Sequence, residues 1–130
     1  MRNVFGVEVP VPDRVTVLDS DLTETRERPY GRVVHERRAD TVLLAEFLLE
    51  GPSGRHILVV ESRSEVDKDK EYAWPYYIAF LRDKYKCDVS LLVVCNKAST
   101  AAWARRPILN GLRDMPSMIV RLIVIGPNAA

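Results

Sequence analysis

The chain has little of what marks several common protein classes. Among its 130 residues there are only two cysteines, Cys87 and Cys95, they do not form a CxxC pair, and no glycine-rich phosphate loop occurs. A zinc site is therefore not expected, and buried thiols are the simpler interpretation of both cysteines. No apolar run approaches the roughly 18–20 residues that cross a bilayer, and residues 1–5 do not open a signal peptide. We expect no membrane partner and a cytoplasmic location.

The chain also lacks a strong excess of charge of either sign. A hydrophobic content of 47% and a charged content of 28% are ordinary for a globular protein, and the length predicts a single domain over residues 1–130. A net charge of +1 argues against a strongly basic nucleic-acid module. From Cys95 onward, however, there are five basic residues and one acidic residue. This basic end suits a phosphate-contacting surface, and it equally suits an ordinary solvated surface.

Three strands, and the start of another at 32–36, are predicted in the first half of the chain. Residues 1–14 are predicted to form an extended entry segment. The charged stretch 20–31, with a Pro29-Tyr30-Gly31 turn, is predicted to be a loop or a long edge connection. The stretch 41–49 is apolar enough for a strand or a helix, but its β-branched start and the turn at 51–54 favour a strand. With 55–61 it would form an antiparallel hairpin. The predicted strands are 14–19, 32–36, 41–49 and 55–61.

The second half alternates helices with strands. Apolar residues at helical spacing predict a helix over 72–86, with Pro75 either in its first turn or at a kink. The continuous apolar run 88–95 is typical of a buried strand. A short helix over 96–106, capped by Asn96 or Ser99, and a last strand over 117–125 complete the chain. This order predicts an α/β single domain with a mixed four- to five-stranded sheet flanked by helices.

Two acidic residues are the best lead to function. Asp40 precedes one strand of the predicted hairpin, and Glu61 ends the other, with Arg63 two residues later on the same face. If Asp40 and Glu61 meet across neighbouring strands, their oxygens can share Mg²⁺ or Mn²⁺. Such a metal polarises a phosphoryl oxygen and supplies hydroxide for attack. The simpler interpretation is that both carboxylates make ordinary surface ion pairs.

Other candidates are aromatic or basic. Trp74, Tyr76 and Tyr77 could stack on bases, although an aromatic stripe at helical spacing is more often part of a core. Arg105 and Arg106, which follow Trp103, could contact phosphates, or could be solvated charges at a helix end.

The Asp40…Glu61-x-Arg63 pattern resembles the D…(D/E)-x-K motif of the PD-(D/E)XK nuclease superfamily. More narrowly, the chain from about Val7 to Pro127 is similar to an uncharacterised actinobacterial family of transposase-like and recombination-promoting-nuclease-like proteins. The elements that carry this similarity are Arg38-Ala39-Asp40, Val60-Glu61, Asp67-x-Asp69-Lys70-x-Tyr72-x-Trp74-Pro75-x-Tyr77, Leu81-Arg82, Cys87, Leu91-Leu92-Val93-Val94, Trp103-Ala104-Arg105 and Pro107-Ile108.

The resemblance implies a restriction-endonuclease-like fold that binds DNA and hydrolyses its backbone with Mg²⁺ or Mn²⁺. Asp40 and Glu61 would be the metal ligands. Arg63, or Lys70 in its place, would be the cationic partner, and phosphate contacts would come from Arg82, Arg105 and Arg106.

The chain departs from the family at two points. Arg63 stands where the superfamily has its catalytic Lys, and arginine stays protonated, so it can stabilise charge but cannot act as a base. Lys68 or Lys70, at the start of the following helix, could replace that lysine. The family's upstream helix is also expected to be missing here. The alternative function is therefore a catalytically degenerate nucleic-acid-binding or protein-interaction module of the same fold, and a homodimer through the uncovered apolar patch is a further expectation.

Overall fold

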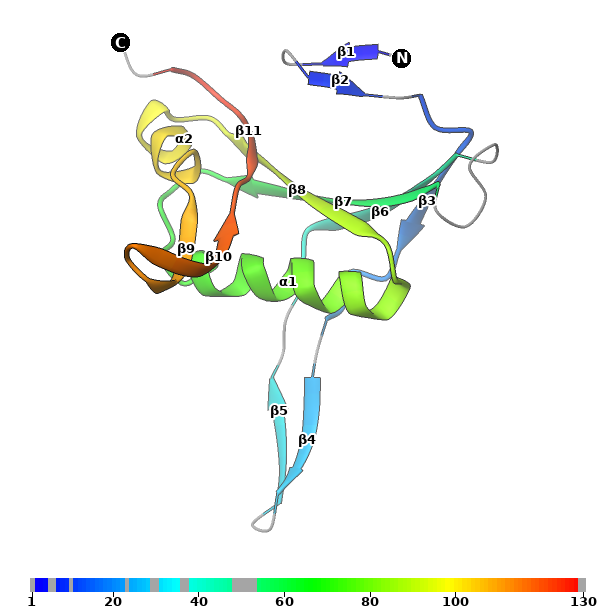
Figure 1. The fold of residues 1–130 in the computed structure, drawn as a ribbon, viewed down its shortest axis with the longest axis vertical. Coiled ribbons are helices and arrows are strands. Elements are labelled where there is room, and N and C mark those ends of the chain that lie inside the picture. Colours follow the sequence, from blue (N-terminus) through cyan, green and yellow to red (C-terminus); the bar gives the residue numbers. More distant parts are fainter. Residues whose placement is uncertain are drawn as a thin grey trace.

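A computed structural model gives the fold of the chain (Figure 1). Side chains are described for residues 11–22, 38–47 and 54–128, and the backbone alone for the strands that lie between or before these ranges. No helix within these described ranges is long and apolar enough to cross a membrane.

A five-stranded mixed sheet forms the centre of the fold, in the order β11-β8-β7-β6-β3. Strand β6 (Thr41–Glu46) pairs antiparallel with β3 (Arg14–Leu18) on one side and with β7 (Arg55–Arg63) on the other. Strands β8 (Asp88–Cys95) and β11 (Ile123–Ile125) continue the sheet in parallel with β7. The predicted α/β class and mixed sheet are thus confirmed. The backbone N–H of Phe47 donates to the Gly54 carbonyl and closes the β6–β7 hairpin, whose predicted turn otherwise lies outside the described residues.

Helix α1 (Lys70–Tyr85) connects β7 to β8 and packs on one face of the sheet (Figure 1). A crossover of this kind is what parallel neighbours require. The helix buries Trp74, Tyr77 and Leu81, as their spacing predicted. Pro75 lies inside the helix rather than in its first turn, because the helix begins at Lys70, two residues earlier than predicted.

The buried side chains of the sheet follow the two-residue period of strands. In β7 the inward-facing series is Ile57, Val59 and Glu61, each with no exposed surface. A carboxylate therefore ends the same row of side chains that forms the hydrophobic core under α1. The placement of Glu61 results from strand alternation, and its charge has to be balanced within the protein.

The end of the chain differs from the prediction. The predicted strand 117–125 is two strands, β10 (Met115–Val120) and β11, separated by two residues. Strand β10 pairs with β9 (Ile108–Leu112), which was not predicted because Asn110 and Gly111 interrupt its apolar pattern. Helix α2 (Ala98–Ala104) begins after Lys97, and no side chain caps it, so the predicted caps were wrong.

The N-terminal third contains two further hairpins. Strands β1 (Arg2–Val4) and β2 (Val7–Val9) pair within the segment predicted to be extended. Strand β4 (Glu24–Arg28) pairs with β5 (Gly31–His35), so the predicted loop or edge connection over 20–31 was wrong at residues 24–28, whereas the predicted strand near 32–36 is confirmed. The polar sequence of β4 does not predict a strand, because β4 is formed by backbone pairing with β5. The predicted turn residues Pro29 and Tyr30 lie outside the described residues.

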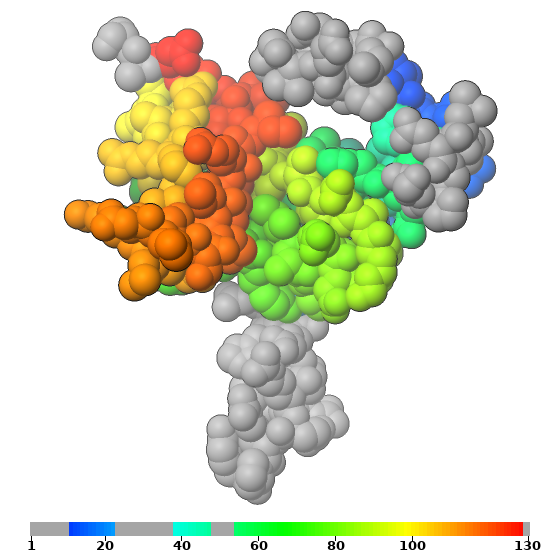
Figure 2. All heavy atoms as spheres, viewed as in Figure 1, coloured from blue at the N-terminus to red at the C-terminus, as the bar shows by residue number. Residues whose placement is uncertain are grey.

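The β9–β10 hairpin lies beside α2 (Figure 2, orange). Its exposed apolar side chains include Leu112 and Met115. Its register shifts between Pro116 and Met118, opposite Gly111. Gly111 has a φ of +120°, and a Cβ atom built there would lie 2.6 Å from the Ser117 backbone nitrogen. Only glycine fits this position without movement of the opposite strand.

We therefore predict that Gly111→Ala destabilises the hairpin by about 1–3 kcal/mol, the usual range for a strained backbone position. Amide hydrogen exchange of β9 and β10 is the measurement, and Asn110→Ala, at the exposed neighbouring position, is the control. Equal protection of the hairpin amides in the two variants would contradict the steric role of Gly111.

Candidate functional site

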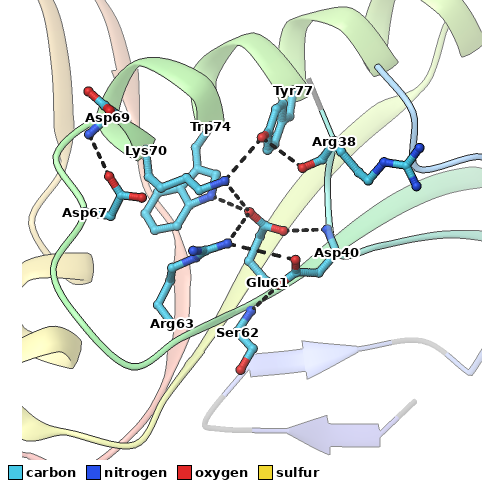
Figure 3. Close-up of polar contacts among 10 residues, drawn as sticks. All are labelled: Arg38, Asp40, Glu61, Ser62, Arg63, Asp67, Asp69, Lys70, Trp74 and Tyr77. Carbon is cyan, nitrogen blue, oxygen red and sulfur yellow. Dashed lines mark hydrogen bonds and ion pairs between the residues drawn. The ribbon is translucent and has the colours of Figure 1, made fainter. Parts of the chain in front are cut away.

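Three elements meet at one end of the central sheet. Asp40 immediately precedes β6, and Lys70 is the first residue of α1. Glu61 and Arg63 lie at the C-terminal end of strand β7. The antiparallel register pairs Thr41 with Val60, which brings Asp40 beside Glu61. The structure thus places on neighbouring strands the two carboxylates that the sequence singled out, with both candidate cations next to them (Figure 3).

The Glu61 carboxylate is fully buried and hydrogen-bonded through both oxygens. Oε2 accepts a bond from the Asp40 backbone N–H at 2.7 Å, and Oε1 accepts one from Trp74 Nε1 at 2.9 Å. A buried carboxylate without such partners would cost several kcal/mol, since its hydration is lost. The indole of Trp74 is therefore more than core filling, because its one polar atom supports the acid.

Asp40 is connected to Glu61 in a reciprocal arrangement. While its backbone N–H donates to Glu61, its own Oδ2 accepts a bond from the Ser62 backbone N–H at 2.9 Å. The Asp40 side chain is 46% exposed, whereas that of Glu61 is 0% exposed. One carboxylate of the pair therefore faces solvent and the other faces the core.

Two cations neutralise the acid pair. Lys70 Nζ lies 3.5 Å from Glu61 Oε1, and Nη2 of Arg63 lies 3.8 Å from Glu61 Oε1 and 3.9 Å from Asp40 Oδ1. Arg63 thus bridges both carboxylates, while Lys70 reaches only the buried one. Arg63 Nε is buried and finds no hydrogen-bond partner among the described residues.

Tyr77 holds Lys70 in position. Its hydroxyl accepts a bond from Lys70 Nζ at 3.3 Å and donates one to the Arg38 carbonyl at 3.1 Å. The ammonium also lies 5.4 Å from the centre of the Tyr77 ring, within the range of a cation–π contact. Lys70 is therefore positioned by Tyr77 of its own helix, and Tyr77 is in turn held by the segment before β6.

The remaining predicted residues lie elsewhere. Lys68 does not join the acid pair and instead lines a hollow beside α1, as does Arg106. Arg82 is exposed on α1. The Arg105 guanidinium donates to the carbonyls of Gly126 and Pro127, at 3.0 and 3.3 Å, so it holds the end of the chain against α2.

The chemistry of the acid pair fits a divalent cation. Mg²⁺ commonly takes one or two carboxylates and completes its shell with water and substrate oxygens. Each carboxylate oxygen has two lone pairs, so the observed hydrogen bonds leave acceptor capacity on Asp40 and Glu61. Over the described ranges of the chain, no group of three or more His, Cys, Asp or Glu side chains is arranged to hold a metal. A cation here would rest on two protein carboxylates and would compete with Arg63 for them.

The cysteines lie apart from this chemistry. Cys95 is buried at the end of β8 and Cys87 is partly buried, and neither forms a disulfide. Burial raises the pKa of both thiols above their usual value, despite nearby arginines that act in the opposite direction. Both side chains therefore remain protonated at neutral pH and are poor nucleophiles.

Sequence reasoning missed one cluster of residues. Trp103 packs against Trp74 with ring centres 5.3 Å apart, and Trp103 Nε1 donates to Glu71 Oε2 at 3.1 Å. Both tryptophans belong to motif elements singled out in the sequence, but nothing in their spacing of 29 residues predicts the contact.

Fold and site together define an α/β domain with a charge-balanced acid pair at one end of its sheet. Comparison with known proteins found no matching family model, no matching curated protein and no matching solved structure.

We predict that Glu61→Gln destabilises the fold by about 3 kcal/mol. The amide would turn an N–H₂ group toward one of two donors, Asp40 N or Trp74 Nε1, and would leave Lys70 and Arg63 without their buried counter-charge. Urea denaturation is the measurement. Glu65→Gln is the matched control, because the exposed Glu65–Lys97 pair contributes at most about 1 kcal/mol. Equal losses in the two variants would contradict a special role for the buried acid.

Proposed function

We propose that this domain is a restriction-endonuclease-like enzyme that hydrolyses phosphodiester bonds of DNA with Mg²⁺ or Mn²⁺. The observation that carries the proposal is the convergence of Asp40, Glu61 and Lys70, from three different elements, at one end of the sheet. Two carboxylates and a lysine are the groups that the superfamily motif requires. The lysine comes from the start of α1 instead of from the strand position that Arg63 occupies.

The chain's own residues have separate roles in this proposal. Asp40 and Glu61 would hold the metal, which when bound supplies an activated water and polarises the phosphate. Lys70, held by Tyr77 and Glu61, would stabilise the negative charge that develops on the phosphate during attack. Trp74 and the Asp40 backbone N–H would keep the Glu61 carboxylate in a fixed orientation.

DNA as the substrate is supported by the distribution of charge. Arg82 and Arg106 are exposed, and basic residues dominate the chain from Cys95 onward. Such side chains hold a phosphate backbone without reading sequence. Arg105 contributes less, because its guanidinium already serves two backbone carbonyls. A cytoplasmic location belongs to the same proposal.

This function predicts that Asp40→Ala and Lys70→Met each lower the rate of plasmid nicking in Mn²⁺ by at least about 100-fold, as the loss of a charge-stabilising group does. Calorimetry should show Mn²⁺ binding that Asp40→Ala abolishes and Lys70→Met retains, since Asp40 would be a metal ligand and Lys70 would not.

Asp83→Ala, which removes an exposed carboxylate from the far end of α1, is the control for both measurements. A wild-type protein that neither binds Mn²⁺ nor nicks DNA would contradict the proposal.

A second candidate function is favoured by Arg63. Its guanidinium lies within 4 Å of both carboxylates, so the protein carries a built-in cation at the place where a metal would bind. If this ion pair persists on DNA, the domain binds nucleic acid without cutting it. Its affinity for DNA would then be indifferent to Asp40→Ala.

Arg63→Gln separates the two functions. Removal of one permanent positive charge about 4 Å from each carboxylate should tighten Mn²⁺ binding by about 10-fold, equivalent to roughly 1.4 kcal/mol, and raise nicking. Calorimetry and plasmid nicking are the measurements, with Arg55→Gln at the opposite end of β7 as the control. Metal binding that stays undetectable in Arg63→Gln would favour the non-catalytic module.

A further inference from the structure

A hollow of about 380 Å³ lies between the first turns of α1, the end of α2 and the start of β9. Neither Asp40 nor Glu61 lines it. Trp74 lines it, however, and the indole nitrogen of the same residue donates to Glu61. The hollow is thus a separate space that shares one wall with the acid pair, and its size falls within the range of about 300–1,000 Å³ of small-molecule sites.

Two tryptophans line one side of the hollow, Trp103 partly exposed and Trp74 almost completely buried. Trp74 and Trp103 pack with an interplanar angle of 38°, and Trp103 is anchored by its bond to Glu71. Ile108 adds an apolar contact from β9. A planar ring that enters here would stack on the Trp103 indole, whose orientation is already set by Trp74 and Glu71, so little conformational freedom is lost on binding.

Charged groups line the same space. Lys68 and Arg106 supply two positive charges, and Glu71 supplies one negative charge. The hydrogen bond from Trp103 uses Glu71 Oε2, which leaves Oε1 as an acceptor for a ligand. The hollow therefore combines a stacking surface, cations for an anionic group and one fixed acceptor.

We propose that this hollow binds a nucleotide whose base carries an exocyclic amino group. The base stacks against the partly exposed ring of Trp103, its amino group donates to Glu71, and its phosphate contacts Lys68 and Arg106. Thymine is disfavoured because its O4 would face the carboxylate with a lone pair in place of a donor. The inference rests on the proposed function in one respect: the nucleotide in the hollow would be an unpaired base of the DNA substrate, next to the acid pair.

Quenching of tryptophan fluorescence tests the site directly, because Trp74 and Trp103 are the only tryptophans of the chain. Titration with dCMP should quench the signal, with binding at least 10-fold tighter than that of dTMP, and inorganic phosphate should leave it unchanged. Equal affinities for dCMP and dTMP would overturn the proposal.

Two variants test the assigned contacts. Arg106→Gln should weaken dCMP binding about 10-fold, and Arg113→Gln, which removes a charge from the tip of the β9–β10 hairpin, should not. Glu71→Gln retains an oxygen for Trp103 and offers an N–H to the ligand, so it should remove or reverse the preference for dCMP over dTMP. An unchanged preference in Glu71→Gln would refute the role of the carboxylate.

Short oligonucleotides identify the source of the ligand. The oligomer and dCMP are titrated separately. If both quench, the site accepts any such nucleotide; if only a single-stranded dC oligomer quenches, the site is one for DNA strands. Absence of quenching by both would overturn the inference. Asp40→Ala separates this result from the proposed function: it should retain quenching and lose nicking. A protein that nicks DNA without any quenching refutes only the hollow.

Discussion

The burial of one carboxylate is the constraint on which the site depends. Glu61 continues the inward-facing row of β7, so its charge lies at the end of the hydrophobic core with no access to solvent. A charge in that position is tolerated only with fixed donors and counter-charges. Asp40 N and Trp74 Nε1 provide the donors, and Lys70 provides the nearest cation. The start of β6, the end of β7 and the first turns of α1 are held together for this reason.

The two cations beside the acid pair have different consequences. Lys70 is restrained by Tyr77 and reaches one carboxylate, which suits a group that stabilises charge on a substrate. Arg63 reaches both carboxylates and has the fixed charge and planar donors that suit a permanent ion pair. Under the proposed function, the balance between hydrolysis and simple binding would therefore depend on whether Arg63 remains between the carboxylates. Trp74 connects this balance to the neighbouring hollow, since one indole supports Glu61 and lines that space.

Much of the fold follows from local pattern. Helical spacing marked the buried face of α1, and continuous apolar runs marked β7 and β8, because a side chain's burial depends mainly on the period of its own element. The failures occurred where pairing between segments outweighed pattern. Strand β4 is polar and exists through its ladder with β5, and β10 leaves the central sheet to pair with β9 across a bulge at Gly111. Backbone hydrogen bonds of this kind leave almost no trace in composition.

The sequence by itself determined the class of the fold, the order of its central elements and the identity of the two acids. The period of strands also placed Arg63 on the same face as Glu61. Only the tertiary structure decided that Glu61 is buried while Asp40 is exposed, that Lys70 and not Lys68 completes the cluster, and that Trp103 reaches Glu71. Each of these depends on how α1 and α2 dock on the sheet. Docking joins residues of different elements, such as Glu71 and Trp103, and no local period encodes such contacts.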